Sequence, residues 1–346
     1  MASDKSGPAS STPLALRIFY IALNVFAAVS IVFANKAVFS LYRFHFVTTL
    51  TLVHTLFTFV GMLVLSRLDF FTPKKLPQVA IAPLALGYVG YIVFNNLSLN
   101  LNTVGFYQIL KIMIAPAVIV MEFLMFGKVQ NFRIIMAVAV VCVGVGIAAV
   151  TDKVSISNVL GVIVGAASVI VTALYQIWAG SKQKELQANS SQLLLAYTPQ
   201  AIALLVVLVP LFDDVGFTNQ TVDTVLGYEY SWGAISAIVV SALLGVLVSL
   251  STFLVIGATS SLTYNVVGHF KTVLILTGGC VLFGEDMPWK RFMGICLTMT
   301  GIIWYTVLSA QAAQAPAQAA IPVKEASPVS PEKERLLPEG KADQSA

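Results

Sequence analysis

Charged residues are scarce in this sequence. Only 10% of its 346 residues are Asp, Glu, Lys or Arg, whereas soluble domains contain about 25%. Hydrophobic residues make up 58%, and the mean hydropathy is +0.86. A single soluble core could not bury so much apolar surface, so most of the chain must lie in lipid. This excludes an ordinary soluble enzyme and predicts an all-α polytopic membrane protein whose first partner is the lipid bilayer.

Cysteine is scarce as well. Cys142, Cys280 and Cys296 all lie in apolar runs, without a CxxC pair and without His at ligand spacing. This pattern disfavours a disulfide framework and a metal site, and no motif for a cofactor is present. The apolar runs also lack paired carboxylates, His clusters and a Ser/His/Asp set. A membrane-embedded enzyme is therefore disfavoured.

Long apolar windows are abundant. A helix needs about 20 apolar residues to cross the hydrocarbon, and ten windows meet this requirement, at 15–35, 45–66, 79–98, 103–125, 131–150, 156–179, 191–212, 231–256, 262–283 and 288–309. We expect ten transmembrane helices. Residues 1–14 are predicted to form a short disordered cytosolic N-terminus rather than a signal or transit peptide, and residues 310–346 a disordered cytosolic C-terminal tail.

The placement of basic residues predicts the orientation. If both termini lie on one side, the short loops on that side hold Arg67, Lys74, Lys75, Lys128, Arg133, Lys182 and Lys184. The opposite loops hold fewer, which favours termini in the cytosol. The longest loop on the opposite side, 213–230, is acidic and contains the sequon Asn219-Gln220-Thr221. Asn219 is a glycosylation candidate only if that loop is lumenal.

Residues 15–150 and 156–309 are similar to each other. When the fourth and ninth windows are aligned, four pairs match at a constant separation: Tyr107/Tyr264, Phe126/Phe283, Gly127/Gly284 and Gly144/Gly301. Each half has five helices, and two copies of an odd-numbered unit must insert with opposite orientation. We therefore expect two inverted five-helix repeats, the plan of many secondary transporters, with a site near the midplane between the halves.

Two lysines lie deep inside predicted spans. Lys111 is in the fourth window and Lys271 in the ninth, and the only carboxylate within a window, Glu122, lies near a helix end. An ammonium group at such depth costs about 2.5–3.5 kcal/mol and marks a functional site by default. The alternative is an acidic partner inside the bundle, for which only Glu122 is available. We therefore predict an anionic substrate, such as a phosphate or diphosphate.

Polar neighbours extend this predicted site. Tyr107 and Gln108 lie close to the helical face of Lys111, and Tyr264 shares the face of Lys271. Tyrosines there would stack on a base, bond a sugar, or simply pack in the bundle. His269 is expected to point away from Lys271 and to serve packing or hydrogen bonding. The predicted substrate-binding residues are Lys111, Lys271, Tyr107, Gln108, Tyr264, Asn265 and Thr272.

Several segments resemble those of one transporter family. They are SIVFANKAVF (30–39), FVTTLTLVH (46–54), NLSLNLNTVGFYQILK (96–111), GVGIAAVTD (144–152), SLTYNVVGHFKT (261–272) and VLFGE (281–285). Together they resemble the nucleotide-sugar and triose-phosphate translocator family of the drug/metabolite transporter superfamily, over residues 17–308. The similarity is greatest to its Lys-Thr subgroup, which includes plant Golgi transporters of UDP-xylose, UDP-rhamnose and UDP-galactose.

The resemblance implies a ten-helix antiporter, with the drug/metabolite transporter fold, that moves a UDP-sugar into the secretory lumen in exchange for a nucleoside monophosphate. The alternative is an exchanger of sugar phosphate, phosphate or another organic anion. In the plastid sugar-phosphate branch, phosphate is held by a lysine that corresponds to Lys111 and by a Lys-Arg pair whose lysine corresponds to Lys271. The arginine position here is Thr272, a departure that weakens the plastid interpretation. The motifs of the GDP-mannose branch are not matched.

The tail bears on the compartment. Residues 332–337 read EKERLL, an acidic dileucine-type signal in which Glu332, Leu336 and Leu337 would contact a sorting adaptor. Such short motifs often match by chance. A Golgi membrane is the predicted location, and a functional dileucine signal would instead favour an endosomal or vacuolar membrane. The sequence leaves open whether the protein forms a homodimer.

Overall fold

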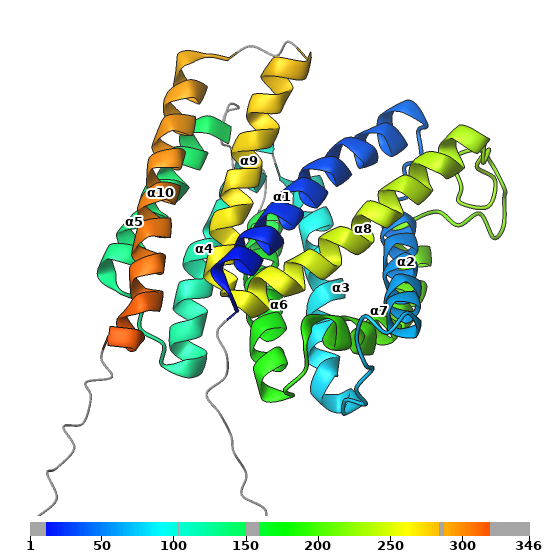
Figure 1. Cartoon of the computed structure of the whole chain (residues 1–346). Helices are drawn as coiled ribbons and strands as arrows, with labels where there is room; N and C mark the ends of the chain where they lie inside the picture. Colours follow the sequence, from blue (N-terminus) through cyan, green and yellow to red (C-terminus); the bar gives the residue numbers. More distant parts are fainter. Residues whose placement is uncertain (1–11, 103, 150–158, 284–286, 319–346) are drawn as a thin grey trace, which may run out of the picture.

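The computed structural model describes residues 12–102, 104–149, 159–283 and 287–318. Within these ranges the chain forms ten α-helices and one short π-helix and no strand. In chain order they are α1 (Leu14–Lys36), η1 (Ala37–Leu41), α2 (Val47–Arg67), α3 (Gln78–Leu101), α4 (Val104–Phe126), α5 (Phe132–Ala149), α6 (Val159–Glu185), α7 (Ser190–Phe212), α8 (Trp232–Ala258), α9 (Ser261–Phe283) and α10 (Trp289–Gln318) (Figure 1). The prediction of an all-α, ten-helix membrane protein is confirmed.

Nine stretches of the described residues are long and apolar enough to cross a membrane. α9 is a further helix of 23 residues, and its first turns carry the polar side chains Tyr264, Asn265, His269 and Lys271.

The predicted ends of the chain differ from the structure in one place. Disorder was expected from residue 310, whereas α10 continues to Gln318. The extension is rich in alanine, which has the highest helix propensity. Residues 1–11, most of the predicted N-terminal segment, and the dileucine motif at 332–337 lie outside the described residues.

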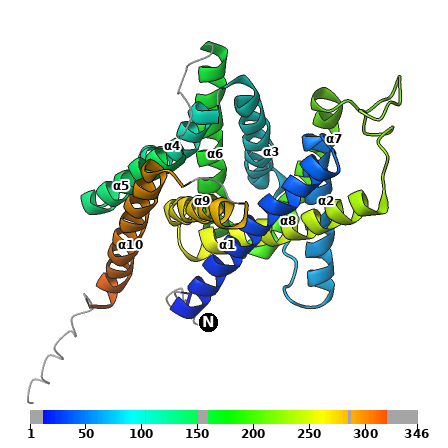
Figure 2. The same ribbon diagram turned by 90° about the horizontal axis from the view of Figure 1, so that it is seen from above.

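The helices pair in a pattern that repeats between the two halves. α5 packs on α10 and α2 on α7, while α3 packs on α6 as α8 packs on α1. Figures 1 and 2 agree that α5 and α10 form one edge of the bundle and α2 and α7 the opposite edge, with α4, α6 and α9 between them. If each helix of the first half corresponds to the helix five places later, the α3–α6 contact corresponds to the α8–α1 contact. The α5–α10 and α2–α7 contacts each join two corresponding helices, and two related repeats would produce this pattern.

Glycines make the α5–α10 contact close. A Cβ on Gly144 would lie 2.5 Å from the backbone nitrogen of Thr298, and one on Gly301 would lie 2.8 Å from the backbone nitrogen of Val141. Val141 and Thr298 have the same separation in sequence as Gly144 and Gly301. The two close contacts are thus equivalent, and small residues permit them as in other membrane helix pairs.

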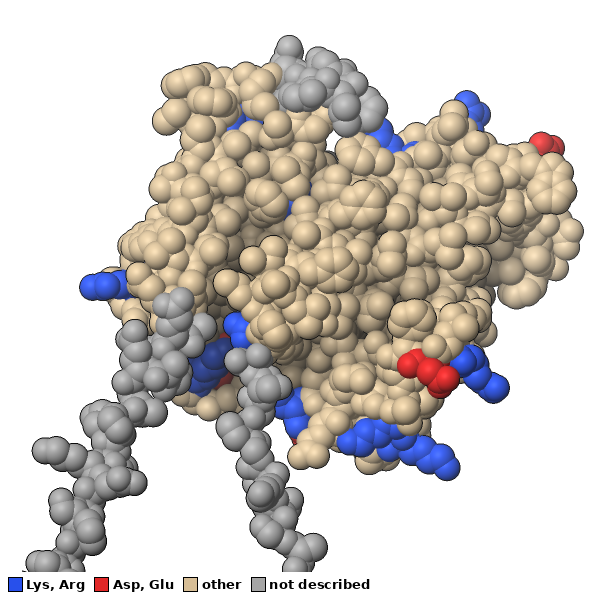
Figure 3. Space-filling model, viewed as in Figure 1, with Lys and Arg blue, Asp and Glu red and all other residues tan. Residues whose placement is uncertain are grey.

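The basic connections lie at one end of the bundle. Lys74, between α2 and α3, donates to the carbonyl oxygens of Leu186 and Gln187, which follow α6, at 3.0 Å each. In the view of Figure 3, most of the visible basic and acidic side chains lie along the lower half of the surface. The first turn of α1 and the last turn of α10 also lie in the lower half of Figure 1.

The loop between α7 and α8 is tied to the start of α2 at the other end. The Asp213 carboxylate accepts hydrogen bonds from the Thr49 amide at 2.6 Å and the Thr49 hydroxyl at 2.7 Å. A carboxylate is stabilised at a helix N-terminus by its free amides and dipole. Tyr228 donates to the carbonyl of Tyr42 at 2.6 Å and packs edge-on against Phe44. The loop therefore has a defined place against the start of α2 and the segment between η1 and α2.

Candidate functional site

A cavity of about 400 Å³ lies in the middle of the bundle, between α3, α4, α6 and α9. Side chains from these helices and from α5 form its wall: Tyr91, Asn95, Tyr107, Gln108, Lys111, Ile112, Ile114, Val145, Thr172, Gln176, Tyr264, Asn265, Gly268, His269, Lys271 and Thr272. All seven predicted substrate-binding residues are among them. Residues that the sequence placed on two separate helices thus line one cavity.

Each lysine of the cavity lies over a tyrosine ring of its own helix. The Nζ of Lys111 is 4.7 Å from the ring centroid of Tyr107, and that of Lys271 is 4.7 Å from the ring centroid of Tyr264. A ring face attracts a cation by about 0.5–2 kcal/mol without cancelling its charge. The two ammonium groups are therefore held in similar settings by α4 and α9.

No carboxylate belongs to the cavity wall as described. Glu122, the acidic residue inside α4, forms an ion pair with Lys128 at 2.5 Å near the end of that helix. The alternative in which an acidic side chain neutralises Lys111 or Lys271 is therefore not realised among the described residues. A site with two cations and no anion attracts an anionic ligand.

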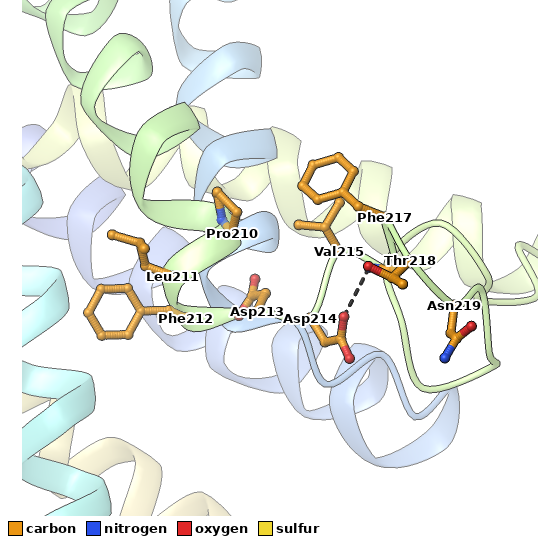
Figure 4. Close-up of a pocket in the computed structure, with 10 residues that line it drawn as sticks. Pro210, Leu211, Phe212, Asp213, Asp214, Val215, Phe217, Thr218 and Asn219 are labelled. Carbon is orange, nitrogen blue, oxygen red and sulfur yellow. Dashed lines mark hydrogen bonds between the residues drawn. The ribbon is translucent and has the colours of Figure 1, made fainter.

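A larger hollow, of about 500 Å³, lies at the α7–α8 loop and is a poorer candidate (Figure 4). Its wall comes from one segment, Pro210–Asn219, and includes Asp213 and Asp214. Asp213 already accepts hydrogen bonds from Thr49, and Asp214 accepts one from the Gly216 amide at 2.9 Å. Two carboxylates of this kind repel an anion, so this hollow does not compete with the central cavity.

A polar seam between α6 and α9 borders the central cavity. The Asn265 amide donates to the Gln176 side chain and, at 2.9 Å, to the Ser261 carbonyl. Ser261 in turn donates to the Gln176 carbonyl at 2.9 Å. On the opposite wall the Asn95 amide donates to Thr172 at 3.1 Å, which joins α3 to α6. These bonds fix the positions of the neutral polar groups around the two lysines.

Comparison with known proteins assigns the family. The sequence pattern of the Triose-phosphate Transporter family matches residues 15–306. The chain belongs to the triose-phosphate transporter family. The resemblance found from its motifs is thereby confirmed.

Relatives within the triose-phosphate transporter family have named substrates. UDP-xylose transporter 2 of Arabidopsis thaliana is 38% identical over 288 residues, which cover 83% of this chain and 79% of the relative. UDP-rhamnose/UDP-galactose transporter 1 of the same plant is 36% identical over 289 residues, covering 82% and 81%. A solved crystal structure with 12% identity superposes with a TM-score of 0.67 over 86% of this chain and 99% of its own. That last likeness concerns the fold.

Thr272 is where this member of the triose-phosphate transporter family departs from the plastid pattern. Its hydroxyl lines the cavity and donates to the carbonyl of Gly268 at 3.2 Å. A threonine that bonds its own helix in this way keeps only acceptor capacity toward a ligand. The two-pronged donor that an arginine would supply to a terminal phosphate is absent at this position.

The expectation that His269 points away from Lys271 and serves packing or hydrogen bonding stays a prediction. Its side chain is 7% exposed and lines the same cavity as Lys271, although the two residues point in different directions from α9. Asn265, His269 and Thr272 form one helical face and Tyr264, Gly268 and Lys271 the next, and the cavity extends over both. Within the described residues the Nε2 atom of His269 has no hydrogen-bond partner.

The structure also adds residues that spacing along one helix did not reveal. Tyr91 stacks on Tyr175 with ring centroids 5.0 Å apart, and its side chain lines the cavity beside Asn95 and Thr172. Asn24 on α1 accepts a hydrogen bond from Lys271 at 2.8 Å. The sequence did contain one signal for Asn24, because it is an isolated asparagine in an apolar helix. A buried amide side chain is costly unless it is hydrogen-bonded.

Proposed function

We propose that this protein is an antiporter that moves a nucleotide-sugar, specifically a UDP-sugar, into the secretory lumen in exchange for a nucleoside monophosphate. The observation that carries the proposal is the central cavity, to which α4 and α9 each contribute a lysine and the described wall contributes no carboxylate. A diphosphate bridge presents anionic oxygens to both ammonium groups. The relatives named as UDP-xylose and UDP-rhamnose/UDP-galactose transporters support a UDP-sugar as the cargo.

Exchange follows from the cost of moving charge through lipid. A conformational change with two uncompensated ammonium groups at membrane depth is unfavourable by several kcal/mol. A bound diphosphate or monophosphate compensates them in either direction, so the bundle reorients when it carries an anion. This is the physical basis on which we assign antiport rather than free uniport.

Orientation and location are part of the same proposal. Termini in the cytosol put the Lys- and Arg-rich connections on the cytosolic side, in agreement with the positive-inside rule. A Golgi membrane suits a carrier that supplies nucleotide-sugars to lumenal reactions.

A sugar-phosphate or other organic-anion exchanger is the second candidate, because the family is named for triose phosphate. Purified protein in liposomes discriminates the two. Vesicles preloaded with UMP are expected to take up labelled UDP-sugars, with little inhibition by excess triose phosphate. Strong inhibition by triose phosphate, with no uptake of UDP-sugars, would reverse the order of the candidates. Rapid uptake into vesicles without UMP would contradict obligate exchange.

The first prediction concerns the two lysines. Lys111→Gln or Lys271→Gln should reduce UMP-driven uptake about 10- to 100-fold, because a charged hydrogen bond contributes about 1.5–3 kcal/mol. Lys75→Gln is the matched control, since Lys75 is exposed between α2 and α3. Its transport rate should equal that of the wild type. Normal uptake by either cavity variant would end the site assignment.

A further inference from the structure

Asn24 is a fully buried polar side chain that bonds both α8 and a lysine of the cavity wall. It lies in α1 with 0% exposure. Its amide nitrogen donates to the hydroxyls of Ser251 at 3.0 Å and Thr252 at 3.3 Å, both on α8. Its amide oxygen accepts from the Nζ of Lys271 at 2.8 Å. One side chain therefore joins α1, α8 and α9.

The orientation of this amide follows from chemistry. An ammonium group has donors only, so the atom that faces Lys271 must be the oxygen of Asn24. The nitrogen is then left for the two hydroxyls, which can accept. The hydrogen bonds of the amide nitrogen and of the amide oxygen thus agree on one orientation of the Asn24 side chain.

A neutral acceptor has a particular consequence next to a substrate-binding lysine. An amide dipole stabilises an ammonium group in a low-dielectric interior and leaves its full charge for an anion. A carboxylate at the same place would stabilise the ammonium more strongly, but it would cancel the charge and compete with the substrate. The other polar side chains described in the cavity wall beside the lysines are likewise uncharged: tyrosine, asparagine, glutamine and threonine.

We propose that Asn24 is a positioning residue that holds the ammonium group of Lys271 at the cavity and keeps its charge available to the phosphate groups of the substrate. This inference rests on the proposed function, because it assigns the role of Lys271 to anion binding. A simple structural link between α1 and α8 would not require the oxygen to face a lysine.

Two substitutions at this position separate the roles. Asn24→Asp is nearly isosteric. The Ser251 and Thr252 hydroxyls can donate to its carboxylate once they turn from the Val248 carbonyl and the Tyr264 hydroxyl, to which they donate in the structure at 3.2 Å and 3.4 Å, so the link between helices is kept in a changed form. The substitution nevertheless adds a charge against Lys271. Asn24→Ala removes all three bonds but adds no charge. A positioning role predicts that Asn24→Asp raises the KM for a UDP-sugar at least tenfold and more than Asn24→Ala does. A purely structural role predicts the reverse order, with Asn24→Ala the worse in both KM and thermal stability.

The experiment is UMP-driven uptake of labelled UDP-xylose at graded concentrations, together with the shift in melting temperature that UDP-xylose produces in the purified protein. Asn95→Asp is the charge-matched comparison, because Asn95 lines the same cavity but bonds Thr172 and the Tyr91 carbonyl. It should raise KM less than Asn24→Asp. Equal increases would overturn the inference, because the effect would then be a general one of negative charge in the cavity.

Failure of this inference is distinguishable from failure of the proposed function. If Lys271→Gln loses transport but Asn24→Asp keeps the wild-type KM and thermal shift, Asn24 has no positioning role and the site stands. If Lys271→Gln transports normally, the site assignment falls and this inference falls with it.

Discussion

At the scale of single residues, the cavity relies on neutral groups to hold its two cations. Lys111 and Lys271 each lie over a tyrosine ring, and Lys271 also donates to Asn24. Spacing along one helix predicted that each tyrosine lies close to the face of its lysine, because residues four or seven apart are near one another on a helix surface. That each ammonium group lies over the tyrosine ring was found only in the structure. Spacing could not predict Asn24, which is distant in sequence from Lys271.

The ring of Tyr264 gives a prediction at this scale. Tyr264→Leu removes the cation–π contact of Lys271 and should raise the KM for a UDP-sugar about 2- to 30-fold, corresponding to the contact's range of about 0.5–2 kcal/mol. Tyr264→Phe keeps the ring and loses only the hydroxyl, which is 3.4 Å from that of Thr252. It should stay near the wild-type value. Uptake kinetics of the two variants test this, and a larger effect of Tyr264→Phe would point to the hydroxyl instead.

At the scale of elements, hydropathy sets the approximate boundaries of the helices. Small residues allow two helices to pack closely. The predicted window 288–309 was shorter than α10, because apolarity marks the membrane span and the alanine-rich helix continues beyond it. Close approach of α5 and α10 depends on Gly144 and Gly301. Their match in sequence was visible, whereas their common interface became visible only in the structure.

A Cβ at either glycine should destabilise this interface. Gly144→Ala and Gly301→Ala would each place a carbon within 3 Å of the partner helix's backbone, and overpacking of this kind costs about 1–3 kcal/mol. Both variants should therefore melt earlier in detergent, measured by fluorescence-detected thermal unfolding. Gly278→Ala is the matched control, because a Cβ there has no described atom within 4 Å. Similar melting of all three variants would contradict the close contact.

At the scale of the whole molecule, five helices (α3, α4, α5, α6 and α9) line the cavity, and the orientation of the bundle decides the direction of transport. The connections that hold Lys74 and Leu186 lie together at one end. The loop that contains Asp213 and Asn219 lies at the other end, against the start of α2 and the segment between η1 and α2. An even number of helices puts the start of α1 and the end of α10 at the same end as the basic connections.

Glycosylation of Asn219 tests that orientation. Asn219 is exposed, and Figure 4 shows its side chain apart from the other labelled residues, on the loop beyond the end of α7. If this loop is lumenal, protein expressed in eukaryotic cells should carry a glycan that an endoglycosidase removes, and Asn219→Gln should migrate like the treated protein. A cysteine introduced at Asn219 that reacts with an impermeant thiol reagent in the cytosol would instead establish the opposite orientation.

The sequence by itself determined the solvent of the chain and the number and approximate limits of its helices, and it singled out the two lysines that are predicted to bind the substrate. These properties depend on local composition and on spacing along one helix. Only the tertiary structure decided that α4 and α9 face one cavity, that His269 lines it, and that Asn24 holds Lys271 from α1 and α8. Such contacts join residues far apart in the chain, and their geometry is set by how whole helices pack.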